Sequence, residues 1–483
     1  MRPGSLGHVV KPCSEPRSSP ARPAKGQATR AQIAGIDFGT SNSAIAVPGK
    51  KRPRIVEHQP SGRPTLPSVV NFPADGVVLI GEEAQRSQQG LTLYSVKRLI
   101  GRTFRGAADL IPSLGYEVTE GEGGNVVIPC PAASEGNLLP EEIASLIISH
   151  LLQSAEESCG SHITKAVISV PAYFDSRQKA AIIQAGTMAG LETVRLVREP
   201  VAAAMAYGLN LKQDQTVLVF DLGGGTLDVS LLEVGGGTIE VLSSGGDPFL
   251  GGDDWTGAIV QWLIKDHLRP AGIDTSSRSV QRNLRAVAEA AKIRLSDSET
   301  VALGMPFRDR SGAPLRVELS REKFDQLAAP LFSRARDALD RAAWQAGVDL
   351  QTAMDERDEL ARRARRSGGG RRNKGSSASP EIATEIRPKR RAPLSKILLV
   401  GGATRMPSVP RFLENMTGTQ PVATNLDPDQ AVALGAAIQA GMLEGTLGDL
   451  MVMDPLQAGL LRALASRHTQ NQQMLGSSDA KLQ

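Results

Sequence analysis

Two short stretches of the sequence place an aspartate, glycines and a threonine between apolar segments. They are Asp37-Phe38-Gly39-Thr40, inside GIDFGTSNSAIAV, and Asp221 to Thr226, inside VLVFDLGGGTLDVSLL. Glycine lets backbone N–H groups approach an anion closely, threonine adds a hydroxyl donor, and a strand-end aspartate can hold a divalent cation through its water ligands. A triphosphate needs both kinds of group, so the two stretches predict a phosphate-binding site.

The two stretches share one design, in which an apolar strand ends in the aspartate, turns tightly and continues as a second apolar strand. A single glycine-rich hairpin of this kind is commonly structural. Two copies, with their aspartates 184 residues apart, instead predict two similar lobes that face each other across a cleft.

Between and beyond these hairpins, short apolar segments alternate with helical patterns. KAVISVPAYF is typical of a buried strand, DSRQKAAIIQAGTMAGL of a helix, and TVRLVREPVAAAMAYGL of a strand that runs into a helix. Two long helical regions are predicted at roughly residues 252–297 and 321–347. The alternation predicts an α/β architecture.

The sequence resembles the nucleotide-binding domain of the 70-kilodalton heat-shock chaperones of the DnaK type, within the actin-like ATPase superfamily. The resemblance runs in family order from about Ile33 to Gly441, through stretches such as GIDFGTSNSAIAV, VKRLIGR, VISVPAYF, REPVAAAMAYGL, VFDLGGGTLDVSLL, ILLVGGATRMP and DPDQAVALGAAIQAG. It implies an actin-like α/β fold with two similar lobes flanking a nucleotide cleft.

The resemblance also implies a domain organisation. The nucleotide-binding domain is expected at residues 33–448, with lobe I at about 33–212 plus 425–445 and lobe II at about 213–424. DLMVMD, residues 449–454, resembles the apolar linker of the family, and the 29 residues after it are too few for a peptide-binding sandwich and lid. Residues 455–483 are therefore expected to form a short tail, either frayed or docked through Leu456, Leu460 and Leu464.

By resemblance, the cofactors are ATP or ADP and Mg²⁺. Asp37 and Asp221 would hold the hydration shell of the metal, and Glu199 would lie near the metal and the attacking water. Lys97 would reach the γ-phosphate. The phosphates would be clamped by residues of both turns: Gly39, Thr40, Ser41, Gly223, Gly224, Gly225 and Thr226. The catalytic set, Lys97, Glu199, Asp221 and Thr226, needs no covalent nucleophile, because phosphoryl transfer depends mostly on positioning and charge neutralisation.

A further set of residues is predicted to contact adenosine. Glu289, Lys292 and Ser296 in AEAAKIRLS lie at helical offsets of 0, 3 and 7 and share one face. By itself, this spacing also fits an ordinary surface Glu–Lys pair. The resemblance makes the helix the ribose and adenine contact, and it adds four further residues: Gly401, Gly402, Arg405 and Asp429.

The sequence departs from the family mainly where nucleotide state is relayed to the linker. Ser176 and Lys179 stand where the family pattern has Asp and Arg, and Arg198 precedes Glu199 in place of Asn. Lysine keeps the positive charge of arginine but lacks its planar fork of donors. These departures concern interdomain signalling more than ATP chemistry.

Composition excludes several classes of protein. The 483 residues are 41% hydrophobic and include three scattered cysteines without CxxC spacing and six dispersed histidines without an HExxH pair. A disulfide framework and a zinc site are therefore not indicated, and a reducing compartment fits best. No apolar stretch is long enough for a membrane span, so no membrane partner is expected.

Positive charge is concentrated in two segments. Residues 1–34 and 361–393 contribute +5 and +9 to a net charge of +4, which leaves about −10 for the rest of the chain. The first segment, which includes a predicted disordered targeting stretch at 1–32, has the Arg-, Ser- and Pro-rich profile of a transit peptide, with a plastid favoured over a mitochondrion or the cytoplasm. The second falls in a predicted disordered insertion at about 355–394, where an acidic partner or RNA could dock.

Together these features predict a Mg-ATP-binding, slowly ATP-hydrolysing switch that acts with a separate protein, such as a co-chaperone, an exchange factor or a large assembly. The alternative is a regulatory or structural subunit that uses the fold for interaction and has little turnover. A sugar or acetate kinase of the same superfamily is disfavoured, because the chaperone-type motifs span the whole core.

Overall fold

The computed structural model describes residues 32–49, 52–74, 76–209, 211–308, 314–350, 393–444 and 451–452. The predicted targeting stretch up to residue 31, nearly all of the predicted insertion and the tail lie outside the described residues, whereas Gln32, the last residue of that stretch, is the first residue of a strand. Leu394, the last residue of the predicted insertion, is instead the first residue of a strand that pairs with Thr216.

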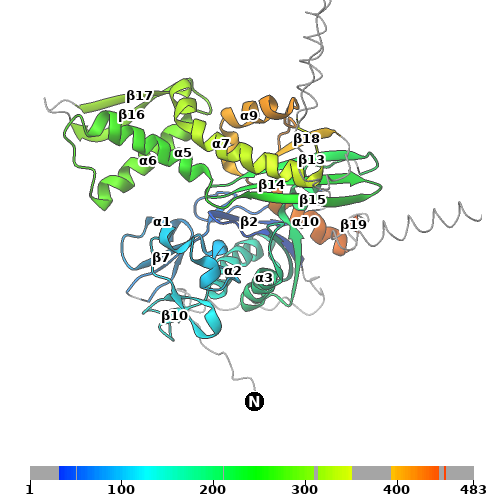
Figure 1. Cartoon of the computed structure of the whole chain (residues 1–483). Coiled ribbons are helices and arrows are strands. Elements are labelled where there is room, and N and C mark those ends of the chain that lie inside the picture. Colours follow the sequence, from blue (N-terminus) through cyan, green and yellow to red (C-terminus); the bar gives the residue numbers. More distant parts are fainter. Residues whose placement is uncertain are drawn as a thin grey trace, which may run out of the picture.

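Two mixed sheets form the centre of the molecule (Figure 1). The first sheet has the strand order β12-β11-β1-β2-β3, with β4 also paired to β2. Its strands are β1 (Gln32–Asp37), β2 (Asn42–Val47), β3 (Arg54–Ile55), β4 (Leu66–Pro67), β11 (Ile163–Val170) and β12 (Thr193–Arg198). We call this sheet and the elements packed on its outer face lobe I.

The second sheet has the order β18-β13-β14-β15-β19. Its strands are β13 (Gln215–Leu222), β14 (Leu227–Gly235), β15 (Thr238–Asp247), β18 (Leu394–Val400) and β19 (Met451–Val452). We call this sheet and the elements packed on its outer face lobe II. Met451 and Val452, two residues of the predicted linker, pair in parallel with Thr238 and Ile239 at the sheet edge.

The two sheets repeat one arrangement. In each, an antiparallel hairpin, β1–β2 or β13–β14, pairs through its first strand with a parallel neighbour, β11 or β18. Residues 217–220 of β13 are all buried, which explains why this strand is continuously apolar rather than alternating. The predicted α/β architecture with two similar halves is confirmed.

Helices cover both faces of the first sheet. The helices α2 (Pro140–Cys159) and α3 (Ser176–Met188) pack on its outer face, whereas α4 (Glu199–Ala206) and α10 (Ala431–Leu443) lie between the two sheets. Small residues allow this close packing. A Cβ on Gly35 of β1 would lie 2.1 Å from the Ala437 amide nitrogen, and one on Gly435 would lie 1.8 Å from the Ala202 carbonyl oxygen.

Lobe II carries most of the remaining helices: α5 (Gly252–Trp262), a π-helical turn (Leu263–Leu268), α6 (Arg278–Arg294), α7 (Arg321–Ala346) and α9 (Ser408–Thr417). The predicted helix at 321–347 is confirmed as α7. The helical region predicted at roughly 252–297 is helical over most of its length but is interrupted between Leu268 and Arg278, so α5 and α6 are separate helices. Pro270 has no amide hydrogen to continue the helix, and Gly272 adopts a positive φ of 73°.

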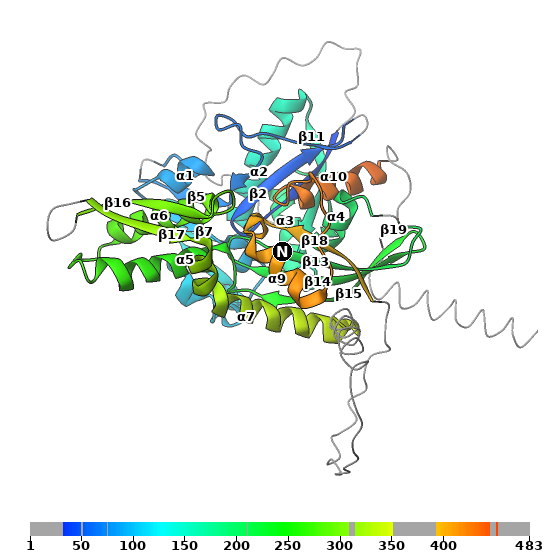
Figure 2. The same ribbon diagram turned by 90° about the horizontal axis from the view of Figure 1, so that it is seen from above.

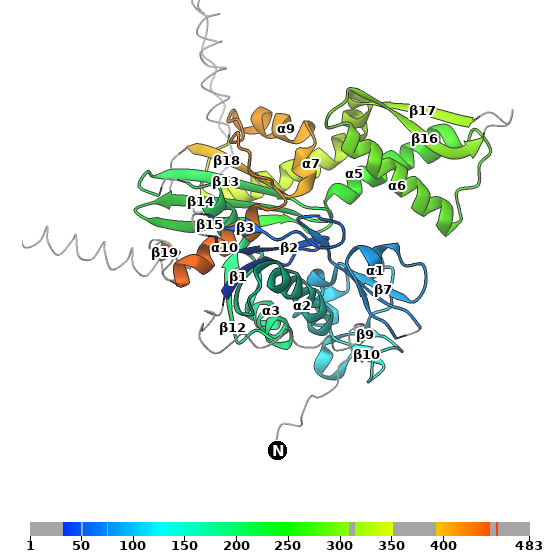
Figure 3. The same cartoon turned by 180° about the vertical axis from the view of Figure 1, so that it is seen from behind.

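The smaller sheets lie at the periphery, on the same side of both lobes (Figures 2 and 3). Lobe II has the hairpin β16 (Thr300–Arg308) and β17 (Pro314–Ser320). Lobe I has α1 (Glu82–Arg86) with three strands, β5 (Val69–Phe72), β6 (Leu79–Ile80) and β7 (Leu91–Tyr94). A further small sheet of lobe I has β8 (Thr119–Glu120), β9 (Val126–Pro129) and β10 (Asn137–Leu138).

Candidate nucleotide site

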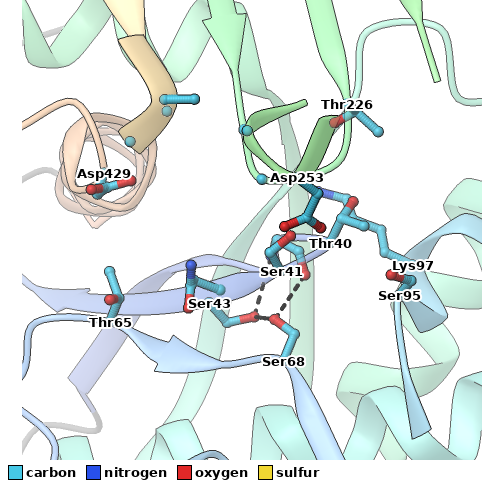
Figure 4. Close-up of a pocket in the computed structure, with 18 of the residues that line it drawn as sticks. Thr40, Ser41, Ser43, Thr65, Ser68, Ser95, Lys97, Thr226, Asp253 and Asp429 are labelled. Carbon is cyan, nitrogen blue, oxygen red and sulfur yellow. Dashed lines mark hydrogen bonds between the residues drawn. The ribbon is translucent and has the colours of Figure 1, made fainter. Parts of the chain in front are cut away.

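A cavity of about 1040 Å³ lies between the lobes and is lined by both glycine-containing turns (Figure 4). Of the predicted site residues, seventeen line this cavity: Asp37, Gly39, Thr40, Ser41, Lys97, Glu199, Asp221, Gly223, Gly224, Thr226, Glu289, Lys292, Ser296, Gly401, Gly402, Arg405 and Asp429. Gly225 does not, because its carbonyl accepts a hydrogen bond from Arg98 and Gly251 packs against its backbone.

Serine hydroxyls hold the lobe I turn in shape. The Gly39 N–H donates to Ser43 Oγ at 3.2 Å, and the Ser68 hydroxyl donates to the Gly39 carbonyl at 2.9 Å. The two serine hydroxyls are 2.8 Å apart, so they form one network (Figure 4). A Cβ on Gly39 would lie 1.9 Å from the Asn42 carbonyl oxygen, which makes glycine necessary there.

The lobe II turn is held by the start of α5. The Gly252 N–H donates to the Gly223 carbonyl at 3.0 Å, and the Asp253 N–H donates to the Gly224 carbonyl at 2.7 Å. The turns of the two lobes approach each other, since a Cβ on Gly224 would lie 2.6 Å from Ser41 Oγ. A phosphate chain between the turns would therefore meet backbone and hydroxyl groups from both lobes.

Four carboxylates surround one lysine at the centre of the cavity: Asp37, Glu199, Asp221 and Asp228. Lys97 Nζ donates to Glu199 Oε1 at 2.5 Å, and both side chains are buried. Asp37 accepts a hydrogen bond of 2.8 Å from the Ser169 hydroxyl. Asp221 and Asp228 lie directly opposite each other on the β13–β14 hairpin, where like charges repel.

The pKa values reflect this excess of negative charge. Burial raises the pKa of Asp37 to about 6, although the Lys97 ammonium opposes the shift. Burial likewise raises the pKa of Asp228 to about 6 and that of Asp221 well above its ordinary range, the latter helped by repulsion from Asp228. Burial would lower the pKa of Lys97, but attraction to Glu199 and Asp37 raises it.

This arrangement fits a hydrated divalent cation. Within the described ranges, no three His, Cys, Asp or Glu side chains are placed to hold a metal ion. The carboxylates nevertheless leave a buried negative charge that one lysine does not balance, and hard cations prefer oxygen ligands, including water. The chemistry of the donor set therefore suits Mg²⁺ held through its waters, as the sequence predicts for Asp37 and Asp221.

The predicted adenosine helix presents an anchored pair of side chains. Lys292 is buried and donates to the Gly252 carbonyl at 2.9 Å and to Thr256 Oγ1 at 3.0 Å, and it pairs with Glu289 at 2.7 Å. Lys292 is thus buried rather than exposed at the surface, whereas Glu289 remains partly exposed. Ser296 follows the end of α6 rather than continuing it, and exposed Ile293 adds an apolar surface to the wall.

The opposite wall comes from the turn after β18. Gly401 has a φ of 83°, and a Cβ there would lie 2.4 Å from the Leu222 carbonyl oxygen. A Cβ on Gly402 would lie 2.7 Å from Asp429 Oδ1. Arg405, in the 3-10 turn Gly402–Arg405, is shared between Asp427 and Asp429. The turn therefore places backbone next to the cavity and keeps the guanidinium at its rim.

The structure adds residues that sequence reasoning missed. Asp228 is the most important, and it accepts a hydrogen bond from the Tyr173 hydroxyl. Strand alternation could have found it, because Asp228 lies two residues after Thr226 and so shares its face. Arg98 and Ser169 reach the site across 127 and 132 residues of sequence, respectively, and no local pattern marks those contacts.

Comparisons with known proteins match this chain over most of its length. A family model described as Hsp70 protein matches residues 33–356 and 389–471. "Chaperone protein dnaK" of Thalassiosira pseudonana is 36% identical over 453 residues, covering 91% of this chain and 68% of the relative. "Chaperone protein DnaK" of Thermus thermophilus is 38% identical over 443 residues, covering 89% and 64%. The "Stromal 70 kDa heat shock-related protein, chloroplastic" of Pisum sativum is 36% identical over 438 residues, covering 89% and 56%.

Proposed function

The chain belongs to the Hsp70 family, and from this premise we propose that it binds Mg-ATP, hydrolyses it slowly and signals nucleotide state to a separate protein. The chain spans between 56% and 68% of the length of the three relatives named above. The observation that carries the proposal is the charge arrangement in the cavity, where buried carboxylates surround Lys97 between two glycine-containing turns.

Each group in the cavity has a proposed task. The backbone N–H groups of Gly39, Gly223 and Gly224 and the hydroxyls of Thr40 and Thr226 would bind the phosphate oxygens. Mg²⁺, when bound, supplies neutralisation of phosphate charge, and Asp37 and Asp221 would hold it through its waters.

Lys97 and Glu199 are proposed to act on the reacting atoms. The Lys97 ammonium would face the γ-phosphate, where it stabilises the charge that develops there. Glu199, buried and fixed by its 2.5 Å contact with Lys97, would orient the attacking water. At the other end, Glu289, Lys292 and Ser296 would contact the ribose and adenine, together with Gly401, Gly402, Arg405 and Asp429.

Single-turnover hydrolysis of Mg-ATP by the full chain tests the proposal. The variant is Lys97→Ala, and the matched control is Lys265→Ala, an exposed lysine outside the cavity. We expect hydrolysis to fall by at least about 100-fold in Lys97→Ala while ATP binding persists, because the lost charge stabilises the transition state more than the ground state. Lys265→Ala should match the parent protein in both measurements.

The result that would contradict the enzyme proposal is tight ATP binding in the parent protein without Lys97-dependent turnover. The protein would then be a nucleotide-stabilised interaction module, which is the alternative predicted from the sequence. Transfer of phosphate to a small metabolite would identify a kinase instead.

We also propose a plastid location and a protein partner. The location rests on the composition of residues 1–32 and on the chloroplastic relative from Pisum sativum. Among the described helices, none is sufficiently long and apolar to cross a membrane. A fluorescent fusion of residues 1–32, followed by import into isolated chloroplasts and mass determination of the product, tests this location. Retention outside the organelle would contradict it.

A further inference from the structure

A second cavity lies on lobe II, between α7 and α9, outside the nucleotide site. Its volume is about 750 Å³, and we call it the α7–α9 groove. It is lined by Asp325, Ala329, Phe332, Ser333, Arg336, Ser408, Arg411, Phe412 and Asn415. The two helices lie side by side in the views from the front, from above and from behind (Figures 1, 2 and 3). Phe332 and Phe412 supply an aromatic surface in the groove, with ring centroids 5.0 Å apart.

One polar group in this groove lacks a partner. Ser408 is only 8% exposed, and its hydroxyl has no hydrogen-bond partner within the described part of the chain. An unsatisfied buried hydroxyl costs roughly 1–3 kcal/mol. Ser408 is also the first residue of α9, so it lies at the positive end of the helix dipole. Both features favour an acceptor that carries negative charge.

The charged side chains of the groove favour the same ligand. Arg411 donates to Asp325 at 2.8 Å and to the Pro407 carbonyl at 3.2 Å, so its charge is already paired. Arg336 is exposed, and no carboxylate among the described residues forms an ion pair with it. The groove therefore has one cation in excess, beside the unpartnered hydroxyl and the aromatic pair.

We propose that the α7–α9 groove binds an acidic peptide segment of a partner protein, with a carboxylate at Ser408 and Arg336 and a large apolar side chain on Phe332 and Phe412. A cavity of this size accepts a few side chains. The basic insertion of the chain itself is disfavoured, because it would bring like charge to Arg336. Nucleic acid is disfavoured as well, because the chain outside its two basic segments carries about −10.

Fluorescence polarisation with the full chain tests the proposal. The probe is a short labelled peptide with aspartates and glutamates on both sides of one phenylalanine, and its counterpart has asparagine and glutamine instead. The groove variants are Arg336→Glu and Ser408→Ala. Arg341→Glu is the matched control, because Arg341 is an exposed arginine on α7 that does not line the groove.

We expect saturable binding of the acidic peptide, with a Kd about tenfold weaker in Arg336→Glu and several-fold weaker in Ser408→Ala. Arg341→Glu should bind like the parent protein. Three outcomes would overturn the proposal: no saturable binding, equal binding of the neutral peptide, or equal binding by Arg336→Glu. Displacement of the peptide by a single-stranded RNA oligonucleotide would also overturn it. ATP binding by each variant verifies folding and is independent of this groove.

Discussion

Replacing Asp228 by Asn should stabilise the protein in the absence of nucleotide and metal. Asp228 faces Asp221 across the hairpin, and its folded-state pKa is about 6, whereas its ordinary pKa is 3.8. A group whose pKa is raised on folding contributes stability below the unfolded pKa, and this contribution is lost as pH rises through the folded pKa. Ionised Asp228 therefore opposes folding at neutral pH.

The size of the effect follows from the shift. A pKa of about 6 instead of 3.8 corresponds to a loss of about 3 kcal/mol once the pH is well above 6. Between pH 4.5 and 7.5, the parent protein should lose about 2 kcal/mol through this group. Asparagine does not titrate, and its carbonyl can still accept the hydrogen bond from Tyr173. Asp228→Asn should therefore be more stable than the parent protein by about 3 kcal/mol at pH 7.5 and by about 1 kcal/mol at pH 4.5.

Urea unfolding in EDTA at pH 4.5 and 7.5 measures this difference. The matched control is Asp340→Asn, which removes an exposed carboxylate of α7 and should leave the free energy of unfolding nearly unchanged. The reasoning is refuted if Asp228→Asn is no more stable than the parent at pH 7.5, or if its gain is the same at both pH values. The same substitution should weaken Mg-ATP binding, because the charge that destabilises the empty site favours the cation.

Three further substitutions test other parts of the structure. Burial and nearby His150 lower the pKa of His58 to about 4, so the stability contributed by neutral His58 is present above pH 6.5 and is lost as pH falls. In urea unfolding, the free energy of unfolding should fall by about 2 kcal/mol by pH 5, and His58→Leu should not show this fall. Gly35→Ala should lower the free energy of unfolding by about 3 kcal/mol in the same assay, because its Cβ would lie 2.1 Å from the Ala437 amide nitrogen. An unchanged unfolding midpoint would contradict this packing. Gly402→Ala should weaken ATP binding about tenfold in calorimetry, since its Cβ would displace Asp429, whereas equal affinity would place the nucleotide elsewhere.

The two hairpins could be predicted because their chemistry is local. An apolar strand, a terminal aspartate and a glycine-containing turn are contiguous in sequence, so Asp37 and Asp221 were found without any knowledge of packing. The long-range contacts could not be found in this way. Arg98 reaches the Gly225 carbonyl from 127 residues away, and the Ser43–Ser68 pair joins two segments of lobe I.

Other differences between the sequence predictions and the structure involve residues whose meaning can be read from the sequence. Pro270 and Gly272 mark the break between α5 and α6, and both are visible in the sequence. Asp228 interrupts an apolar strand at a position that alternation assigns to the Thr226 face. The α7–α9 groove is different, because it depends on how two distant helices pack, which local periodicity does not determine.

The pairing of β19 with β15 has a mechanical consequence. Helix α10 packs on the first sheet and ends at Leu443, whereas Met451 is paired to the edge of the second sheet. The seven peptide steps from Glu444 to Met451 can extend to about 25 Å at most. Among the described residues, Met451 and Val452 fasten the far end of this segment to the edge of the second sheet. If the lobes rotated apart beyond that reach, the pairing of β19 with β15 would break first.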